Sequence, residues 1–335
     1  MRGGDVAEST LRDRYGRAVT YLRVSVTARC NLRCFYCLPR MRGAAARPEQ
    51  LDLEELATAV ASGVALGITK IRLTGGGPLV RPGVVDLVRR LRAIPGLCDL
   101  ALSTNGTLLA EHAVALKAAG LMRVNVSVDS LRPSVFRALT GRDDLARVTA
   151  GIRAARDAGL APLKLNVVVV RGVNDDEMPA LLAFAARHDA QVRFIEYMPL
   201  GLGERWRSSY VSRAEILERL RPLLADAPPR RATGDTASYY ALADGGEVGV
   251  ISPVSCRFCD LCNRLRLTAD GRLRPCLTNE GEVDLRAALR PVPCAEALAS
   301  AFRAATAGRP EFGTYTTDAE TRAATGGRAM AAIGG

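Results

Sequence analysis

Six short β-rich runs alternate with amphipathic helical stretches between Tyr21 and Met198, and this alternation restricts the chain to few folds. Apolar residues recur at helical spacing between the runs, as in 53–64 and 181–186. Six β/α repeats predict a parallel sheet closed or nearly closed into a barrel, with functional side chains at the carboxyl ends of the strands. The expected strands are Tyr21–Val26, Lys70–Thr74, Asp99–Ser103, Arg123–Ser127, Pro162–Val169 and Gln191–Glu196.

The remainder of the 335-residue chain lies outside this repeated unit. The stretch "LADAPPRRATGD" has the Pro, Gly and charge content of a linker, and short strands and an "ADG" turn follow it. We therefore predict an α/β fold: an incomplete (β/α)6 TIM-like barrel at 21–224 and a small β-containing extension at 225–325. Residues 1–20 are expected to form a flexible arm, and residues 326–335 a tail that ends in Gly-Gly.

Composition narrows the possible partners. The net charge is +11, and only Lys70, Lys117 and Lys164 among the 46 basic residues are lysines. This arginine content indicates either a GC-rich genome or an anionic partner such as a phosphorylated small molecule. Aromatic residues make up 5% and form no stacking repeat, which argues against a surface for single-stranded nucleic acid, and we expect no nucleic-acid partner. No run approaches the roughly 20 apolar residues that span a bilayer, so we expect a cytoplasmic protein without membrane contact.

Six of the nine cysteines fall into two groups. Cys30, Cys34 and Cys37 form a C-x3-C-x2-C run after the first strand, and a second group lies in the extension. Structural zinc takes four ligands, and the only histidines, His112 and His188, lie in helical patterns. A 4Fe-4S cluster held by three cysteines leaves one iron open to another ligand, so we favour iron-sulfur over zinc. The second group consists of Cys259, Cys262 and Cys276.

The three-cysteine run after a first strand resembles the radical S-adenosylmethionine (SAM) superfamily. Further motifs follow in order along the chain: "YLRVSVTARCNLRCFYCLPR", "KIRLTGGGPLVRP", "LSTNG", "RVNVSVDSL", "KLNVVVVRGVNDDE", "VRFIEYMPLG", "FCDLCNRLRLTADGRLRPCL" and "IGG". Their order resembles the GTP 3′,8-cyclase family of molybdenum cofactor biosynthesis over nearly the whole chain. The three-cysteine run alone is typical of the superfamily, whereas its combination with the C-x2-C-x13-C group and the terminal double glycine is specific to the family.

The resemblance implies two 4Fe-4S clusters and SAM as cofactors, with SAM on the open iron of the first cluster and guanine facing that of the second. It implies that Gly334 and Gly335 enter the active site and assist catalysis. The residues implied to hold SAM are Tyr36, Gly76, Ser127 and Met198. Those implied to contact GTP are Arg23, Arg72, Ser103, Lys164, Arg264 and Arg266. Guanidinium forks on β-structure suit a triphosphate, which needs permanently charged donors.

The activity that the resemblance implies is cyclisation of GTP to (8S)-3′,8-cyclo-7,8-dihydroguanosine 5′-triphosphate, the first step of molybdopterin biosynthesis. An electron donor such as flavodoxin or ferredoxin and a downstream cyclic pyranopterin monophosphate synthase are implied partners. The chain is expected to act as a monomer or homodimer.

Gly77 departs from the family pattern, in which a Gly-Gly-Glu-Pro sequence follows the second strand. The missing carboxylate would hold the SAM amino group, and the loss of a charge-assisted hydrogen bond of about 1.5 to 3 kcal/mol predicts SAM binding weaker by about 10- to 100-fold. Three explanations for this residue stay open: natural divergence with a compensating group, an introduced substitution, and a lost or changed activity.

Cys256 is a second departure from the family pattern. A cysteine in this position could complete a closed cluster or a four-cysteine zinc site. We interpret Cys256 as a bystander. Two other functions stay open: a radical SAM enzyme that modifies peptides and carries an auxiliary cluster, and an inactive, cluster-bearing nucleotide-binding scaffold.

Overall fold

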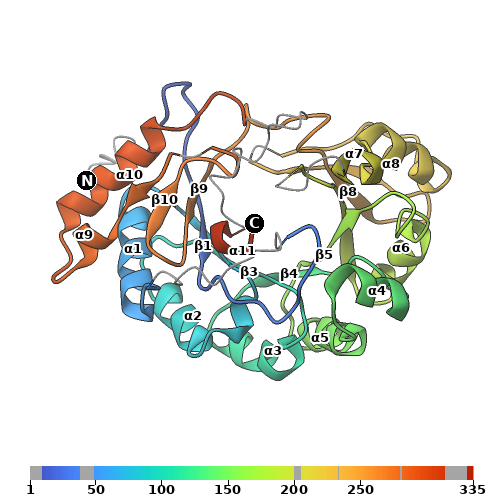
Figure 1. Cartoon of the computed structure of the whole chain (residues 1–335), viewed down its shortest axis with the longest axis horizontal. Helices are drawn as coiled ribbons and strands as arrows, with labels where there is room; N and C mark the ends of the chain where they lie inside the picture. Colours follow the sequence, from blue (N-terminus) through green and yellow to red (C-terminus); the bar gives the residue numbers. More distant parts are fainter. Residues whose placement is uncertain are drawn as a thin grey trace, which may run out of the picture.

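The computed structural model describes residues 10–37, 49–199, 205–232, 234–279, 281–313 and 330–334. In these residues the strands form one eleven-stranded sheet in the order β11-β10-β9-β1-β2-β3-β4-β5-β6-β8-β7. The sheet curves into a horseshoe, with helices along its outer side and the C-terminal helix α11 on its inner side (Figure 1). Its two edge strands, β11 and β7, do not pair with each other, so the barrel is incomplete, as predicted.

The six expected strands are present, and each end lies within one residue of its expected position. Strands β1 to β6 pair in parallel, each with its neighbour in sequence. They are β1 (Tyr21–Ser25), β2 (Lys70–Thr74), β3 (Asp99–Thr104), β4 (Arg123–Ser127), β5 (Leu163–Val169) and β6 (Ala190–Glu196).

The helices between these strands cover the convex side of the sheet (Figure 1). Helix α1 begins at a capping box: the Asp52 carboxylate accepts from the backbone N–H of Glu54 and Glu55, and the Glu55 carboxylate accepts from the N–H of Asp52. The α-helices are α1 (Leu53–Ala65), α2 (Val84–Arg92), α3 (Leu109–Ala118), α4 (Pro133–Thr140), α5 (Leu145–Asp157), α6 (Met178–Ala186), α7 (Arg205–Ser209), α8 (Arg213–Leu220), α9 (Arg286–Leu289), α10 (Ala295–Ala307) and α11 (Met330–Ile333). Two 3-10 helices are η1 (Pro78–Val80) and η2 (Arg221–Leu223).

The C-terminal extension lengthens the barrel sheet at both edges. Beyond β6 lie β8 (Glu247–Ile251), which is parallel to it, and the antiparallel β7 (Ala237–Ala241). Beyond β1 lie β9 (Arg264–Leu267), which is parallel to it, and the antiparallel β10 (Arg272–Arg274) and β11 (Val283–Asp284). The extension therefore flanks the barrel on two sides, and the segment between β8 and β9 carries Cys259 and Cys262.

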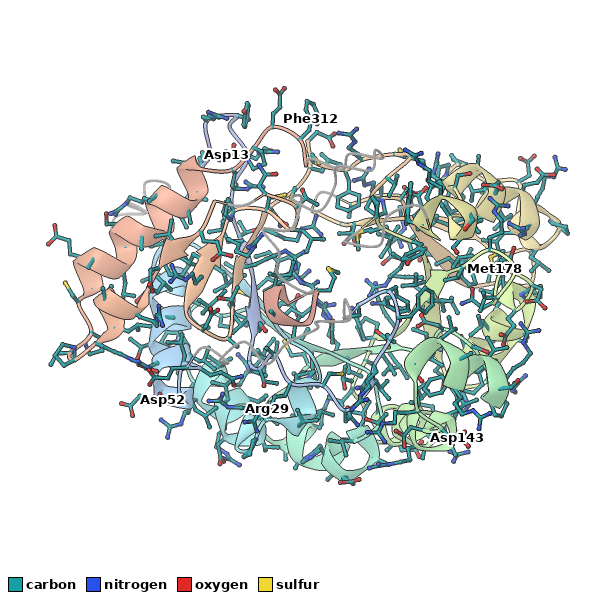
Figure 2. All side chains as sticks on the ribbon, viewed as in Figure 1. Asp13, Arg29, Asp52, Asp143, Met178 and Phe312 are labelled. Carbon is teal, nitrogen blue, oxygen red and sulfur yellow. The ribbon has the colours of Figure 1, made fainter. Side chains whose placement is uncertain are left out.

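Residues 10–20, the described part of the predicted N-terminal arm, pack against the barrel. Leu11 and Val19 are buried, and Arg12 and Ala18 form a β-bridge between them. Asp13 lies near the segment after α10 that carries Phe312 (Figure 2), and Arg17 donates to the carbonyl oxygen of Pro310 at 2.6 Å. Residues 13–17 and the segment after α10 thus meet beside the second cysteine group.

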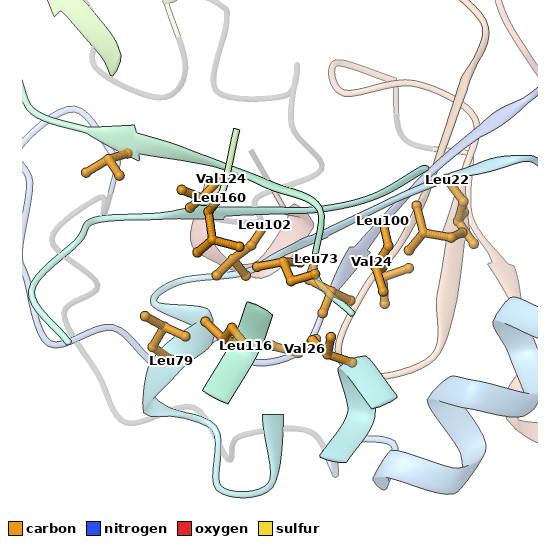
Figure 3. Packing of buried hydrophobic residues seen from close by; sticks show 14 of the residues in the cluster. Leu22, Val24, Val26, Leu73, Leu79, Leu100, Leu102, Leu116, Val124 and Leu160 are labelled. Carbon is orange, nitrogen blue, oxygen red and sulfur yellow. The ribbon is translucent and has the colours of Figure 1, made fainter. Parts of the chain in front are cut away.

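The core lies between the sheet and the helices. Successive side chains of a strand point to opposite faces of the sheet, so every second residue faces the core and the others face the inner side. Leu22, Val24, Leu73, Leu102 and Val124 are buried in one apolar cluster (Figure 3). The residues between them in each strand point to the other face of the sheet. These alternate positions supply the polar side chains of the cavity described below. No helix in the described part of the chain has the length and apolar character needed to span a bilayer.

Candidate functional site

A cavity of about 380 Å³ lies on the inner face of the sheet. Its lining includes every residue that the resemblance assigns to the two clusters, SAM and GTP, apart from the two glycines of the tail. The cysteine groups come from distant parts of the sequence and meet because β9 pairs with β1. The lining residues among them are Cys30, Cys34, Cys37, Cys259, Cys262, Cys276, Tyr36, Gly76, Ser127, Met198, Arg23, Arg72, Ser103, Lys164, Arg264 and Arg266.

The loop with the first cysteine group is held by the glycines after β2. The backbone N–H of Gly76 donates to the carbonyl oxygen of Thr27, and that of Gly77 to Arg29, both at 2.8 Å. A Cβ atom at Gly76 would lie 2.4 Å from the carbonyl oxygen of Arg29, so only glycine permits this approach. The thiol of Cys30 accepts from Asn105 Nδ2 at 3.6 Å.

Gly77 itself has no backbone requirement for glycine. Its φ of −128° and ψ of 97° are in the extended region that any residue adopts. A Cβ atom would lie 3.3 Å from Asn31 Oδ1, 3.5 Å from Asn105 Nδ2 and 3.6 Å from Cys30 Sγ. A side chain at this position would therefore start beside the first cysteine group and needs only a small shift of Asn31.

A buried carboxylate orients Tyr36, which lies within the first cysteine run. Asp129 follows β4 and accepts from the Tyr36 hydroxyl and from the backbone N–H of Val168, the latter at 2.8 Å. Burial raises the pKa of Asp129 to about 6, although both hydrogen bonds oppose this. Burial and the neighbouring carboxylate of Asp129 also raise the pKa of the Cys34 thiol.

The second cysteine group is surrounded by hydrogen-bond donors. Arg264 donates from Nε and Nη2 to Cys262 Sγ, both at 3.4 Å, and the backbone N–H of Gly313 donates to Cys259 Sγ at 3.4 Å. Burial alone would raise the pKa of the Cys262 thiol, but the charges of Arg264 and Arg309 lower it to about 6. A thiol of this kind is readily deprotonated and able to ligate metal.

Cys256 is exposed and does not line the cavity, which agrees with its interpretation as a bystander. The described residues contain no three His, Cys, Asp or Glu side chains grouped closely enough to hold a metal ion. That finding applies to ligands that share a single metal ion. In a 4Fe-4S cluster each thiolate binds its own iron atom, so the thiols do not have to meet at one point. Each group supplies three thiols, which is the number that a 4Fe-4S cluster with one open iron requires.

Basic side chains from several strands converge between the cysteine groups. Arg23 on β1 lies in register with Arg72 on β2 and Arg266 on β9. Arg72 is 3% exposed and donates to the Tyr21 hydroxyl at 2.6 Å and to Ser103 Oγ at 3.4 Å. Burial and the charges of Arg266 and Arg72 lower the pKa of Arg23. Such crowding of like charges favours a bound polyanion.

Two further groups in this region have pKa values near neutrality. Burial and the charge of Arg193 lower the pKa of Lys164, which donates to the Tyr239 hydroxyl at 2.7 Å, to about 8. Burial would raise the pKa of Tyr21, but the charges of Arg72 and Arg23 lower it to about 7. The protonation of both groups affects the charge that a bound anion would meet.

The described end of the tail reaches this basic region. The carbonyl oxygen of Gly334 accepts from Arg23 Nε at 3.1 Å and from Arg266 Nη1. Its φ is +68°, and a Cβ atom would lie 2.5 Å from Thr74 Oγ1, so the position requires glycine. Gly335 lies outside the described residues.

Sequence reasoning missed Tyr21, Asn125, Asp129 and Arg193, all of which line the cavity. A signal was available for three of them. Tyr21 and Asn125 lie two residues before Arg23 and Ser127 on the same strands, and Arg193 alternates with the buried Val192 and Phe194. Applying the strand period to each run would have found them. Asp129 lies beyond β4, and no spacing rule assigns its partner Tyr36.

Comparisons with known proteins agree with this geometry. The family model described as radical SAM superfamily matches residues 24–185, and that described as molybdenum cofactor synthesis C matches residues 190–314. A protein of Pelotomaculum thermopropionicum named GTP 3′,8-cyclase is 47% identical over 307 residues, covering 90% of this chain and 94% of that protein. One of the same name from Streptomyces coelicolor is 47% identical over 308 residues, covering 89% of each. The crystal structure of Streptococcus suis SuiB bound to S-adenosylmethionine shares the fold, with a TM-score of 0.58 and 11% identity over 87% of this chain and 69% of that chain.

Proposed function

Because this chain belongs to the GTP 3′,8-cyclase family of the radical SAM superfamily, we propose that it is a lyase that cyclises GTP to (8S)-3′,8-cyclo-7,8-dihydroguanosine 5′-triphosphate. This reaction is the first step of molybdopterin biosynthesis. The observation that carries the proposal is the single cavity that both cysteine groups and the basic residues of β1, β2, β5 and β9 share.

Membership of the superfamily assigns an iron-sulfur cluster and SAM to the chain. We assign the first 4Fe-4S cluster to Cys30, Cys34 and Cys37, and a second to Cys259, Cys262 and Cys276. A cluster with SAM bound supplies the one-electron chemistry that can take a hydrogen atom from the ribose. Tyr36, Gly76, Ser127 and Met198 are the residues that would hold SAM, since they line the same cavity as the first group.

The basic residues bind and orient the nucleotide. Arg23, Arg72 and Arg266 lie on three neighbouring strands in register, so their guanidinium groups can contact one triphosphate. Ser103, Lys164 and Arg264 add donors around them. Because these side chains sit on strands, they hold the nucleotide in a fixed orientation, and the burial of the site excludes water. Gly334 contacts Arg23 and Arg266, which supports a role for the tail next to the nucleotide.

The remaining partners follow from this function. An electron donor such as flavodoxin or ferredoxin would reduce the cluster, and the product would pass to cyclic pyranopterin monophosphate synthase. The chain would act as a monomer or homodimer. The peptide-modifying alternative has weaker support, because the structure of Streptococcus suis SuiB bound to precursor peptide SuiA is only 14% identical to this chain and shares the fold alone.

Gly77 supports one second candidate, a scaffold that binds clusters and GTP but does not cleave SAM. A side chain at position 77 would start beside Cys30 and could reach SAM bound to the first cluster. Glycine has no side chain and so offers no hydrogen-bond acceptor there. The scaffold and the cyclase differ in one product, 5′-deoxyadenosine.

The test is anaerobic reconstitution with iron and sulfide, followed by addition of SAM, GTP and dithionite. The cyclase should bind about eight irons per chain and release both 5′-deoxyadenosine and the cyclised nucleotide. Cys259→Ser should lower the iron content to about four, whereas Cys98→Ala, at an exposed cysteine outside the cavity, should leave it unchanged. Eight irons and GTP binding without 5′-deoxyadenosine would refute the cyclase and favour the scaffold.

A further inference from the structure

Asp13, Arg17 and Arg309 form a buried ion-pair cluster, here called the Asp13 cluster. The side chain of Asp13 has 0% exposure, and that of Arg309 has 2%. Asp13 Oδ2 accepts from Arg17 Nε at 2.7 Å and from Arg309 Nη1 at 2.8 Å. Asp13 Oδ1 accepts from the backbone N–H of Tyr15 and Arg17, both at 3.0 Å. A buried carboxylate needs such compensation, and here four hydrogen-bond donors, two of them on guanidinium groups, supply it.

Both guanidinium groups continue from Asp13 to the second cysteine group. Arg17 Nη1 donates to the carbonyl oxygen of Cys259 at 2.7 Å, and Arg309 Nη2 donates to that of Cys262. The backbone N–H of Cys262 in turn donates to the carbonyl oxygen of Cys259 at 3.2 Å. Each arginine therefore bridges one carboxylate to one cysteine carbonyl, which the planar fork of a guanidinium permits and a lysine ammonium does not.

The same cluster fixes the segment that approaches the thiol of Cys259 from the other side. Arg17 Nη2 donates to the carbonyl oxygen of Pro310 at 2.6 Å, and Nη1 also donates to that of Glu311 at 3.0 Å. Two residues further on, the backbone N–H of Gly313 donates to Cys259 Sγ at 3.4 Å. The N-terminal segment, the Cys259–Cys262 turn and the segment 309–313 are thus held by one set of charges.

The charges of the Asp13 cluster also act on the turn. Two guanidinium groups and one carboxylate leave a net charge of about +1 behind two cysteines, and this charge is shielded from water by burial. A cluster bound by three thiolates carries negative charge, which increases on reduction. A buried positive charge beside it therefore favours the reduced form.

We propose that the Asp13 cluster is a positioning device for the second iron-sulfur cluster, which orients the Cys259–Cys262 turn and raises the reduction potential of the metal centre. This inference rests on the second cluster assigned under the proposed function. The N-terminal segment accordingly belongs to the metal site, although it contributes no ligand to it.

The test isolates the second cluster in the full-length chain by replacing Cys30, Cys34 and Cys37 with alanine. Iron content, the electron paramagnetic resonance spectrum of the reduced protein, its midpoint potential and its melting temperature are then measured in Asp13→Asn and Arg17→Lys. The matched control is Glu55→Gln, which breaks the ion pair of Glu55 with Arg290. Like the Asp13 cluster, this ion pair ties the C-terminal region to the barrel, but neither Glu55 nor Arg290 lines the cavity.

Arg17→Lys should weaken iron binding by about 10-fold and change the spectrum, because lysine keeps the charge and loses the bridge. Asp13→Asn should raise the midpoint potential of the cluster that remains, because it removes a negative charge near the metal. Glu55→Gln should keep the iron content, spectrum and potential of the reference.

If Asp13→Asn and Arg17→Lys lower the melting temperature but keep the reference iron content, spectrum and potential, the Asp13 cluster only anchors residues 13–17 to the segment 309–313, and the inference is wrong. If the reference chain itself binds no iron, the second cluster is wrong too, and the inference falls with it. The two failures are therefore distinguishable.

Discussion

Replacing Gly77 by glutamate tests whether one missing carboxylate limits SAM binding. Position 77 follows β2 and lies beside Cys30, Asn31 and Asn105. Its φ of −128° imposes no strain on an L-residue, so the substitution removes flexibility without forcing the backbone. The new Cβ would be 3.3 Å from Asn31 Oδ1, so the Asn31 amide, which is hydrogen-bonded to Asn105 and Thr107, must shift slightly to make room. We therefore expect Gly77→Glu to fold and to retain the iron content of the unmodified chain.

The magnitude follows from the bond that the carboxylate would make. A hydrogen bond to a charged amino group contributes about 1.5 to 3 kcal/mol. Since 1.4 kcal/mol corresponds to a factor of ten, SAM affinity should increase by about 10- to 100-fold. A glutamine side chain has the same length without the charge, and a neutral hydrogen bond contributes about 1 kcal/mol, so Gly77→Gln should increase the affinity by only about 5-fold.

The assay is equilibrium binding of SAM to the anaerobically reconstituted protein, followed by the rate of 5′-deoxyadenosine release with GTP and dithionite. Gly77→Ala serves as the control for reduced backbone freedom and should leave the affinity unchanged within about 2-fold. Equal SAM affinity of the glutamate and glutamine variants would refute the reasoning, because the charge would then have no part in holding the ligand. Tighter binding without faster 5′-deoxyadenosine release would show that Gly77 affects binding alone.

Three further predictions concern the same cavity. GTP affinity should fall as pH rises from 7 to 9, because Tyr21, with a pKa of about 7, gains negative charge and Lys164, with a pKa of about 8, loses positive charge. The pH dependence of GTP binding should lose one part in Tyr21→Phe and the other in Lys164→Arg. A GTP affinity independent of pH in the unmodified chain would contradict this prediction. Gly334→Ala should slow formation of the cyclised nucleotide at an unchanged melting temperature. A Cβ at this position would lie 2.5 Å from Thr74 Oγ1, and a φ of +68° costs an L-residue about 1 to 2 kcal/mol. Normal turnover of this variant would argue against this position of the tail. Cys256→Ala should keep the full iron content, since Cys256 is exposed outside the cavity, and a loss of iron in this variant would identify Cys256 as a ligand.

The barrel strands and the direction of their side chains were predictable from local sequence, whereas the roles of the cavity residues came from the resemblance to the family. The six strands follow from short β-rich runs, and the two-residue period places Leu22 and Leu73 in the core and Arg23 and Arg72 on the inner face. The spacing of Cys30, Cys34 and Cys37, together with the lack of a nearby fourth cysteine or histidine, indicated a cluster with an open iron. These features are local, because side-chain direction and ligand spacing depend on neighbours a few residues apart.

The pairing of distant segments could only be learned from the tertiary structure. Nothing in the sequence places β9 beside β1, yet this pairing puts Arg266 in register with Arg23 and brings the second cysteine group to the cavity. The sequence likewise suggested a flexible N-terminal arm at Asp13, whereas the fold brings residue 13 into contact with residue 309 and buries its carboxylate. Such contacts join residues hundreds of positions apart and depend on how the whole sheet is assembled, so composition and spacing carry no record of them.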